Sequence, residues 1–177
     1  MTVVYPEGTP TLGATKVVAA VAVADATAPK LATEIDAATS VDLSCFLLAN
    51  GWNPDASTAK GTKPARLCSK TQQEQLNRTT WTIPDLMYSY DPQADDTAPA
   101  NEAKALLVEG ARIPVVERRG PDAQEDPFAV GDRTRTFFLE LGPQIDSGDL
   151  TDENGEFYIK QSAVIVGEAP VHGVVVA

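Results

Sequence analysis

Alternating apolar residues form the clearest structural pattern near the start of the chain. Between Lys16 and Leu48 there are two apolar runs, Val17–Ala24 and Val41–Leu48, and they are separated by a stretch that contains Asp25 and Pro29. Valine-rich runs bounded by Pro, Asp and Thr are typical of β-strands, because β-branched side chains pack well on a pleated surface. The pattern therefore predicts two strands joined by a long loop.

Further strands are expected downstream. The segments that predict them are Trp81–Ile83, Ile113–Glu117, Arg133–Leu141 and Phe157–Val166. Pro84 removes a backbone donor, so we expect a sheet edge, a bulge or a strand break at that point. In the third segment, period-2 alternation places Arg133, Arg135, Phe137, Leu139 and Leu141 on one face and Thr134, Thr136, Phe138 and Glu140 on the other.

One segment, Ala100–Glu109, has helical character. Its start and end signals are Asp96 or Thr97 as the cap, Pro99 in the first turn and Gly110 as the terminator. A helix of roughly ten residues is marginal in water, so we expect Leu106 and Leu107 to pack on a sheet. With no internal repeat, the chain is predicted to be mainly β, an antiparallel β-sandwich or barrel with one short flanking α-helix.

The remaining segments read as connections and ends. Residues 1–15, rich in Gly, Pro and Thr, predict an extended N-terminal arm, followed by a β-sandwich domain over residues 16–168 and a C-terminal tail over residues 169–177. Asp55–Pro64 shows no periodicity and is expected to be a loop, and Asp122–Asp132 predicts a second, acidic loop. The apolar end Val174–Ala177 is expected to dock on another surface.

Charge and cysteine usage narrow the classes of function. The 177 residues fit one domain, and 14 Lys and Arg against 25 Asp and Glu give a net charge of −11. Such an acidic chain is poorly suited to gripping phosphate groups. Cys45 and Cys68 lie in segments expected to be strands and form no C-x-x-C pair, so we expect buried free thiols rather than a disulfide or a zinc site.

Membrane and export signals are weak. No apolar stretch approaches the roughly 20 residues that span a bilayer, so the sequence predicts no transmembrane anchor. A signal peptide ending near Ala24 is disfavoured, because Glu7 and two prolines precede it and Lys16 is the only positive charge there. The glycosylation pattern at Asn77 is then fortuitous.

No residue or motif of the sequence supports a catalytic, cofactor or metal site. His172, the only histidine, lies near the C-terminus and is expected to be a surface residue. Gly8–Gly13 lacks the Lys and Ser or Thr of a phosphate loop. The acidic turn over residues 146–155 does not have EF-hand spacing. Trp52 and Trp81 are expected to be core or interface anchors rather than sugar platforms.

The order of several short motifs points to a family. These are Arg66-Leu67-Cys68-Ser69, then Trp81 to Tyr90 followed by Asp91-Pro92-Gln93, then the short helix, Val115-Val116-Glu117-Arg118-Arg119-Gly120 and two more strands. Each motif is weak singly, and their common order carries the comparison. The chain resembles the major tail protein, or tail tube protein, of siphophages, particularly those of actinobacterial hosts. The resemblance spans nearly the whole chain.

The resemblance implies a structural protein of the virion tail. Its members have a β-sandwich core with a flanking helix and assemble into hexameric rings that stack into a tube for viral DNA, without catalytic residues. It implies ring-to-ring contacts through Asn53–Lys63 or Asp122–Asp132. We place the lumen on Lys16–Ala24, Val41–Leu48, Arg133–Leu141 and Phe157–Val166. Implied partners are further copies, a tape-measure protein, a tail terminator and distal tail proteins, in the virion and, during assembly, the host cytoplasm.

Three alternatives stay open at this point. A related virion part, such as a tail terminator or a head decoration protein, would form one ring but no long tube. A monomeric β-sandwich could act as an adhesion or carbohydrate-binding module. An enzyme with a carboxylate site is also compatible with so acidic a chain.

Overall fold

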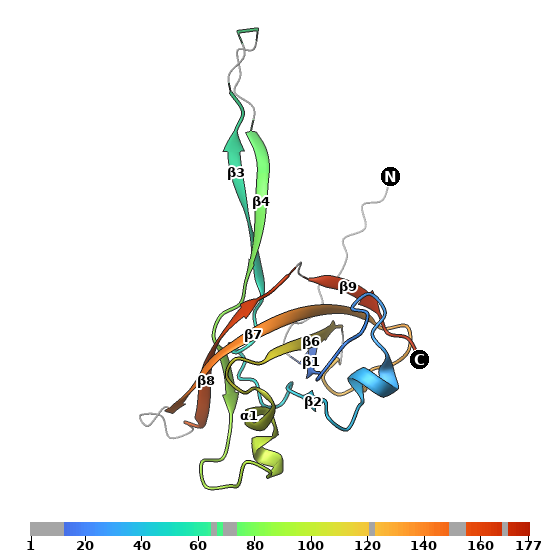
Figure 1. Cartoon of the computed structure of the whole chain (residues 1–177), viewed down its shortest axis with the longest axis vertical. Helices are drawn as coiled ribbons and strands as arrows, with labels where there is room; N and C mark the ends of the chain where they lie inside the picture. Colours follow the sequence, from blue (N-terminus) through green and yellow to red (C-terminus); the bar gives the residue numbers. More distant parts are fainter. Residues whose placement is uncertain (1–12, 65–66, 69–73, 121–122, 149–154, 168–169) are drawn as a thin grey trace, which may run out of the picture.

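The computed structural model describes residues 13–64, 67–68, 74–120, 123–148, 155–167 and 170–177. In Figure 1 a curled β-sheet body lies at one end, and a two-stranded hairpin projects far out of it. The strands are β1 Thr15–Ala19, β2 Val41–Asp42, β3 Asp55–Thr62, β4 Glu74–Thr82, β5 Leu86–Ser89, β6 Arg112–Arg119, β7 Arg133–Gly148, β8 Phe157–Ile165 and β9 Val171–Val174. The helical segments are the π-helical turn η1 Leu31–Ile35, the 3₁₀ turn η2 Pro99–Asn101 and the α-helix α1 Glu102–Leu106.

Among the described residues, seven strands form one antiparallel sheet in the order β2-β1-β6-β7-β8-β5, with β9 paired to β7. The 16-residue strand β7 connects its two halves. Its first half lies between β6 and β9, and from Leu139 to Gly148 it pairs with β8. The mainly β architecture with an antiparallel sheet and one short α-helix confirms the predicted fold class.

The segment that follows β2 joins the two ends of this sheet. Val18 and Ala19 of β1 pair with β2, and a few residues later Leu47 forms a bridge with Tyr88 of β5. The backbone N–H of Leu48 donates to the carbonyl of Met87 at 2.9 Å, and that of Ser89 donates to Phe46 at 2.8 Å. The sheet is thereby closed toward a barrel, which removes two open strand edges.

Two hydrophobic clusters lie on opposite faces of the sheet. The larger fills the inside and includes Val17, Val115 and Phe137, with Leu107 below it at the end of α1. The smaller includes Val18, Ile35, Val116, Phe128 and Val175. Adjacent residues of β1 and β6 therefore point into different clusters, which explains why these strands are apolar throughout.

The two N-terminal strands are shorter than predicted. β1 ends at Ala19, and Ala20 donates a last hydrogen bond to the carbonyl of Pro114, which has no N–H to return. Of Val41–Leu48 only two residues are strand, because the Asp42 carboxylate accepts from the N–H of Ser44 and the chain turns. The later strands β6, β7 and β8 lie where they were predicted, and β7 extends beyond its expected end.

The predicted helix is present but shorter. Pro99–Asn101 is a 3₁₀ turn and the α-helix covers Glu102–Leu106, without a side-chain cap from Asp96 or Thr97. Leu107 is fully buried and Leu106 packs against the inner cluster, so the predicted packing on the sheet is confirmed.

The loop predicted over Asp55–Pro64 was wrong, because this segment contains β3, which pairs with β4 over its whole length. The hairpin is exposed on both faces, so its sequence shows no apolar period. Pro84 marks a break between β4 and β5, which was one of the expected outcomes. The apolar chain end docks on its own sheet: β9 pairs with β7, and Val175 is buried.

Candidate assembly surfaces

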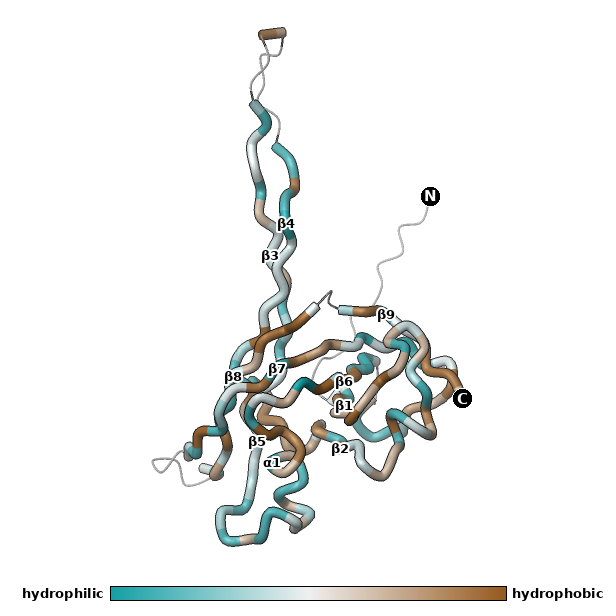
Figure 2. The backbone as a smooth tube through the Cα atoms, viewed as in Figure 1, coloured by the Kyte–Doolittle hydropathy of each residue, from teal (hydrophilic) through white to brown (hydrophobic). Residues whose placement is uncertain are grey.

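The projecting hairpin formed by β3 and β4 is the most exposed element of the molecule. Along both strands every residue is exposed except Gly61 and Trp81, which are half-buried. Figure 2 shows hydrophilic colours along most of the hairpin, whereas hydrophobic colours concentrate in the strands of the body. At its far end, Leu67 is fully exposed. A ribbon of this kind, alone in water, is marginal, so it gains most from contact with another chain.

Both strands of the hairpin are anchored at their base to the inner hydrophobic cluster, through contacts with the ring of Phe137. Trp52, just before β3, meets Phe137 edge-on at 5.7 Å between ring centroids, and Trp81, near the end of β4, meets the same ring at 6.1 Å. Phe137 is fully buried. Gly51 lets this base approach β5, because a Cβ there would collide with the carbonyl oxygen of Met87. The two tryptophans are thus core anchors, as predicted.

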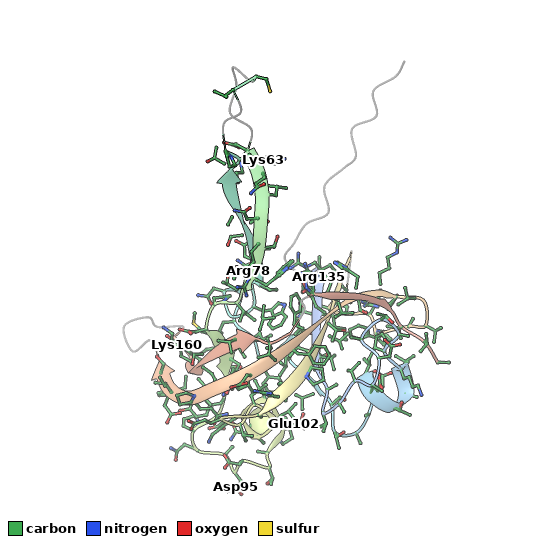
Figure 3. The ribbon with its side chains drawn as sticks, turned by 45° about the horizontal axis from the view of Figure 1, so that its top comes forward. Lys63, Arg78, Asp95, Glu102, Arg135 and Lys160 are labelled. Atoms are coloured by element: carbon green, nitrogen blue, oxygen red, sulfur yellow. The ribbon has the colours of Figure 1, made fainter. Side chains whose placement is uncertain are left out.

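The hairpin carries cations that are not paired with any acidic side chain in the described part of the chain. Lys60, Lys63 and Arg78 are exposed and form no ion pair with any described residue. In Figure 3, Lys63 lies toward the far end of the hairpin and Arg78 nearer its base, and Asp95 lies at the opposite end of the molecule.

That opposite end is an acidic loop between β5 and α1, held by one buried amide. Asn101 is 1% exposed, and its side-chain oxygen accepts from the N–H of Asp91 at 2.9 Å. Its side-chain nitrogen lies within hydrogen-bond distance of the carbonyls of Asp91, Ala94 and Asp95. This amide fixes the loop that contains the Tyr90-Asp91-Pro92-Gln93 motif, and it leaves the acidic side chains exposed.

The second acidic loop, between β6 and β7, is tied down by Arg118. The guanidinium donates to Asp132 at 2.6 Å and to the carbonyls of Ala123, Asp126 and Pro127. Burial acts to raise the pKa of Asp132, but the N–H of Ala129 and the guanidinium outweigh it and hold the pKa below its usual value. From Ala123 onward this loop is therefore part of the body rather than a projecting arm.

A buried polar network supports α1 from inside the barrel. Gln161 is fully buried and donates to the carbonyls of Leu107 and Gly142, both at 2.8 Å. The hydroxyl of Tyr88 donates to its side-chain oxygen at 3.0 Å, and burial raises the pKa of Tyr88 well above its usual value. Gln144 donates to the carbonyls of Lys104 and Leu107. The last carbonyls of the short helix are satisfied in this way.

A second buried polar group joins β6 and β7 near the base of the hairpin. Glu117 of β6 is 1% exposed, and both of its carboxylate oxygens accept from Arg135 of β7, at 2.9 and 2.7 Å. Arg119 pairs with the same carboxylate. Val17 of β1 lies directly opposite Glu117 on the other side. Glu117 and Arg135 lie on the same face of their strands as Val115 and Phe137, so this ion cluster borders the inner hydrophobic cluster.

The outer face of β7 and β8 carries a scattered set of exposed apolar side chains. Ile145 and Val164 are both 58% exposed. Their cross-strand partners are polar: Ile145 lies opposite Lys160, and Val164 lies opposite Glu140. This mixed face is a further surface available to another copy of the chain.

The residues considered for chemistry do not come together. His172 is exposed on β9. Residues 149–154 of the acidic turn and residues 8–12 of the Gly8–Gly13 segment lie outside the described residues. Within the described part of the chain, no group of three His, Cys, Asp or Glu could hold a metal ion. None of the described helices is long and apolar enough to cross a membrane.

The two cysteines are free, as predicted, but they are exposed rather than buried. Neither lies in a strand: Cys45 is in the turn after β2, and Cys68 is in a turn at the far end of the hairpin. The expectation of strand positions was wrong, because short apolar runs do not distinguish a strand from a turn that packs on one side.

Together, these features define a structural β-protein: a closed antiparallel body with an exposed arm and charged loops. The chain belongs to the phage tail tube protein family, whose model matches residues 2–177. It is therefore a structural component of a bacteriophage tail, as the resemblance implied. A search of curated proteins finds no match.

Proposed function

We propose that this protein assembles into hexameric rings that stack into the tail tube of a siphophage and conduct viral DNA into the host. The observation that carries the proposal, beside the family, is the exposed hairpin of β3 and β4, fixed at its base by Trp52 and Trp81. A head-to-tail contact that closes by rotation gives a ring, and a second contact that does not close gives a filament. The hairpin supplies a contact of the second kind.

Of the two segments that the resemblance offered for ring-to-ring contact, the geometry favours the hairpin. It leaves the body entirely, and its eight-residue strand β3 alone spans about 26 Å at 3.3 Å per residue. The loop before β7 is instead bound to its own body by Arg118. We therefore assign the inter-ring contact to Asn53–Lys63 and its partner strand rather than to Asp122–Asp132.

The proposed tube needs no catalytic, cofactor or metal residue. A hexamer would carry six times the net charge of −11, a formal charge of −66, which disfavours retention of DNA in transit. We keep the lumen assignment to the four segments named from the sequence, of which Arg133–Leu141 and Phe157–Val166 contribute the longest strands of the body. The arm over residues 1–15 adds a further contact between subunits, whereas the C-terminal segment is already paired with β7 of its own chain.

The remaining partners follow from the same role. A tail tube would meet a tape-measure protein in its lumen, a tail terminator at one end and distal tail proteins at the other. The subunits would collect in the host cytoplasm before they enter the virion. An actinobacterial host stays a prediction from the resemblance.

Negative-stain electron microscopy of concentrated, purified protein tests the proposal. Stacked rings with a central channel are the expected result. Single rings that never stack would point to a tail terminator or decoration protein. Persistent monomers that are retained on a glycan array would support an adhesion module and contradict the tube, and turnover of a substrate lost on carboxylate substitution would support an enzyme.

A further inference from the structure

Charge is divided unequally between the hairpin and the rest of the chain. Residues 55–82 contain five Lys and Arg against two Asp and Glu, a net charge of +3. The other residues contain nine Lys and Arg against 23 Asp and Glu, a net charge of −14. The projecting hairpin is therefore basic although the protein as a whole is acidic.

The far end of the body has the opposite character. The loop from Asp91 to Glu102 contains four acidic residues and no Lys or Arg, and all four side chains are exposed. Within the described residues only Asp96 is paired, with Lys104 at 2.9 Å. Figure 1 shows the hairpin and this loop at opposite ends of the long axis. Each subunit is therefore an electrostatic dipole, basic at one end and acidic at the other.

The acidic loop is prearranged for a partner. Asn101 binds its backbone at four points, so little conformational freedom remains to be lost on contact. The hairpin cations Lys63 and Arg78, by contrast, have no counter-charge on any described residue. The ligand they lack is anionic, and an ordered anionic surface of the right kind exists on every other copy of the chain.

We propose that the basic hairpin of one subunit docks on the acidic loop 91–102 of a subunit in the next ring. The contact rests on the proposed tube and gives it a polarity, since basic and acidic ends alternate along the axis. Complementary charge also disfavours the wrong, head-to-head stacking, because two hairpins or two acidic loops repel. The ion pairs would be close to solvent and therefore sensitive to salt.

Nucleic acid is the rival partner for a basic arm. The second copy is favoured because the hairpin has only three net positive charges against −14 on the rest of the chain, which is little to hold a polyanion against the repulsion of the body. A partner of matching charge and fixed geometry is present at equal concentration in any solution of the protein.

Two reciprocal variants test the contact. The hairpin variant is Lys63→Glu with Arg78→Glu, and the loop variant is Asp95→Lys with Glu102→Lys; all four residues are labelled in Figure 3. The control variant, Lys30→Glu with Arg112→Glu, has the same net charge of −15 as the hairpin variant but alters exposed cations elsewhere. Circular dichroism and thermal unfolding establish that each variant folds.

The expected result is that each reciprocal variant alone forms rings but no tubes, and that an equimolar mixture restores tubes. The mixture works because each altered end meets an end of opposite charge on the other variant. The control variant forms tubes alone. Wild-type tubes shorten between 0.15 M and 1 M NaCl, as the screening length falls from about 8 to about 3 Å.

Other outcomes overturn the inference and leave the proposed function intact. Tubes formed by either reciprocal variant alone would show that these charges do not join the rings. A mixture of folded variants that stays as rings would show that hairpin and loop do not meet. DNA retention lost in a hairpin variant that still forms tubes would assign the hairpin to DNA. Wild-type protein that never forms tubes would instead defeat the proposed function itself.

Discussion

The buried carboxylate of Glu117 offers a sharp test of how the body is stabilised. Substitution Glu117→Gln keeps the side-chain volume and removes the charge that Arg135 and Arg119 share. The matched control is Glu140→Gln on the neighbouring strand, where Glu140 pairs with Arg112 at 2.6 Å. The chemical change is the same at both sites, and the side chains differ in burial: that of Glu117 is 0% exposed, and that of Glu140 is 41% exposed.

The two substitutions should lower the free energy of unfolding by amounts that differ several-fold. Breaking a fully buried ion pair destabilises by about 3–5 kcal/mol, because it leaves an uncompensated charge. The side chains of Arg135 and Arg119 are 20% and 53% exposed, so water recovers part of their solvation, and we expect a loss of about 2–3 kcal/mol for Glu117→Gln. The pair of Glu140 with Arg112, whose side chain is 73% exposed, should be worth about 0–1 kcal/mol.

Urea unfolding of dilute, monomeric protein measures both values. With a slope of about 2 kcal/mol per M, Glu117→Gln should lower the midpoint by about 1–1.5 M, and Glu140→Gln by less than about 0.5 M. Low protein concentration matters, because assembly would add its own stabilisation. Equal midpoints for the two variants would refute the idea that burial of Glu117 decides its contribution.

Three further predictions concern single sites. Because the pKa of Asp132 is lowered in the folded state, its pairing with Arg118 stabilises the protein above the ordinary carboxyl pKa, and this contribution is lost as the pH falls through the folded pKa. Asp132→Asn should therefore lower the urea midpoint more at pH 7 than at acid pH, and an equal loss at both would contradict the linkage. Gln161→Leu removes the donor to the Gly142 carbonyl and the acceptor of the buried Tyr88 hydroxyl, and it should cost about 2–4 kcal/mol. The exposed control Gln75→Leu should cost no more than about 0.5 kcal/mol, and thermal unfolding measures both. Cys45 and Cys68 should both react with a thiol reagent in the native protein, and protection of either would argue against its exposure.

The strands of the body could be predicted because they pack on one or two cores. β7 shows the clearest case: Phe137, Leu139 and Leu141 point into the inner cluster, and Thr134 and Thr136 are buried on the other face. That alternation is visible in the sequence. The flanking helix was also predictable from its start and end signals, although Asn101 holds the preceding loop in place of a cap.

The hairpin of β3 and β4, which we propose as the contact between rings, could not be predicted as a strand pair. β3 and β4 are exposed on both faces, so neither carries a hydrophobic period, and Asp55–Thr62 consists of small and polar residues typical of loops. Thr58 and Thr79 are weak indications of strand pairing, because threonines often face each other across neighbouring strands. Their hydroxyl oxygens lie 2.9 Å apart. The sequence also shows that residues 55–82 have a net charge opposite to that of the other residues. Such a difference indicates a segment that binds a partner of its own.

The closure of the sheet was missed for a different reason. Val41–Leu48 is apolar because it lies between β1 and β5 and covers both, not because it is a regular strand. Its side chains Asp42 and Ser44 bind nearby backbone groups, and these contacts turn the chain. Side-chain-to-backbone hydrogen bonds of this kind compete with the hydrogen bonds of a regular strand. Which of them forms depends on the tertiary structure, so it cannot be predicted from the spacing of apolar residues.

The double grip of Trp52 and Trp81 on Phe137 makes the hairpin a cantilever. Its root is embedded in a packed core, and its free length is a two-stranded ribbon that can twist and flex at low cost. Both strands of the hairpin are therefore attached to the body beside one buried ring, Phe137. If such hairpins link the rings of a tube, the tube could bend while the contacts between its rings stay intact. The central channel would then remain continuous in a curved tube.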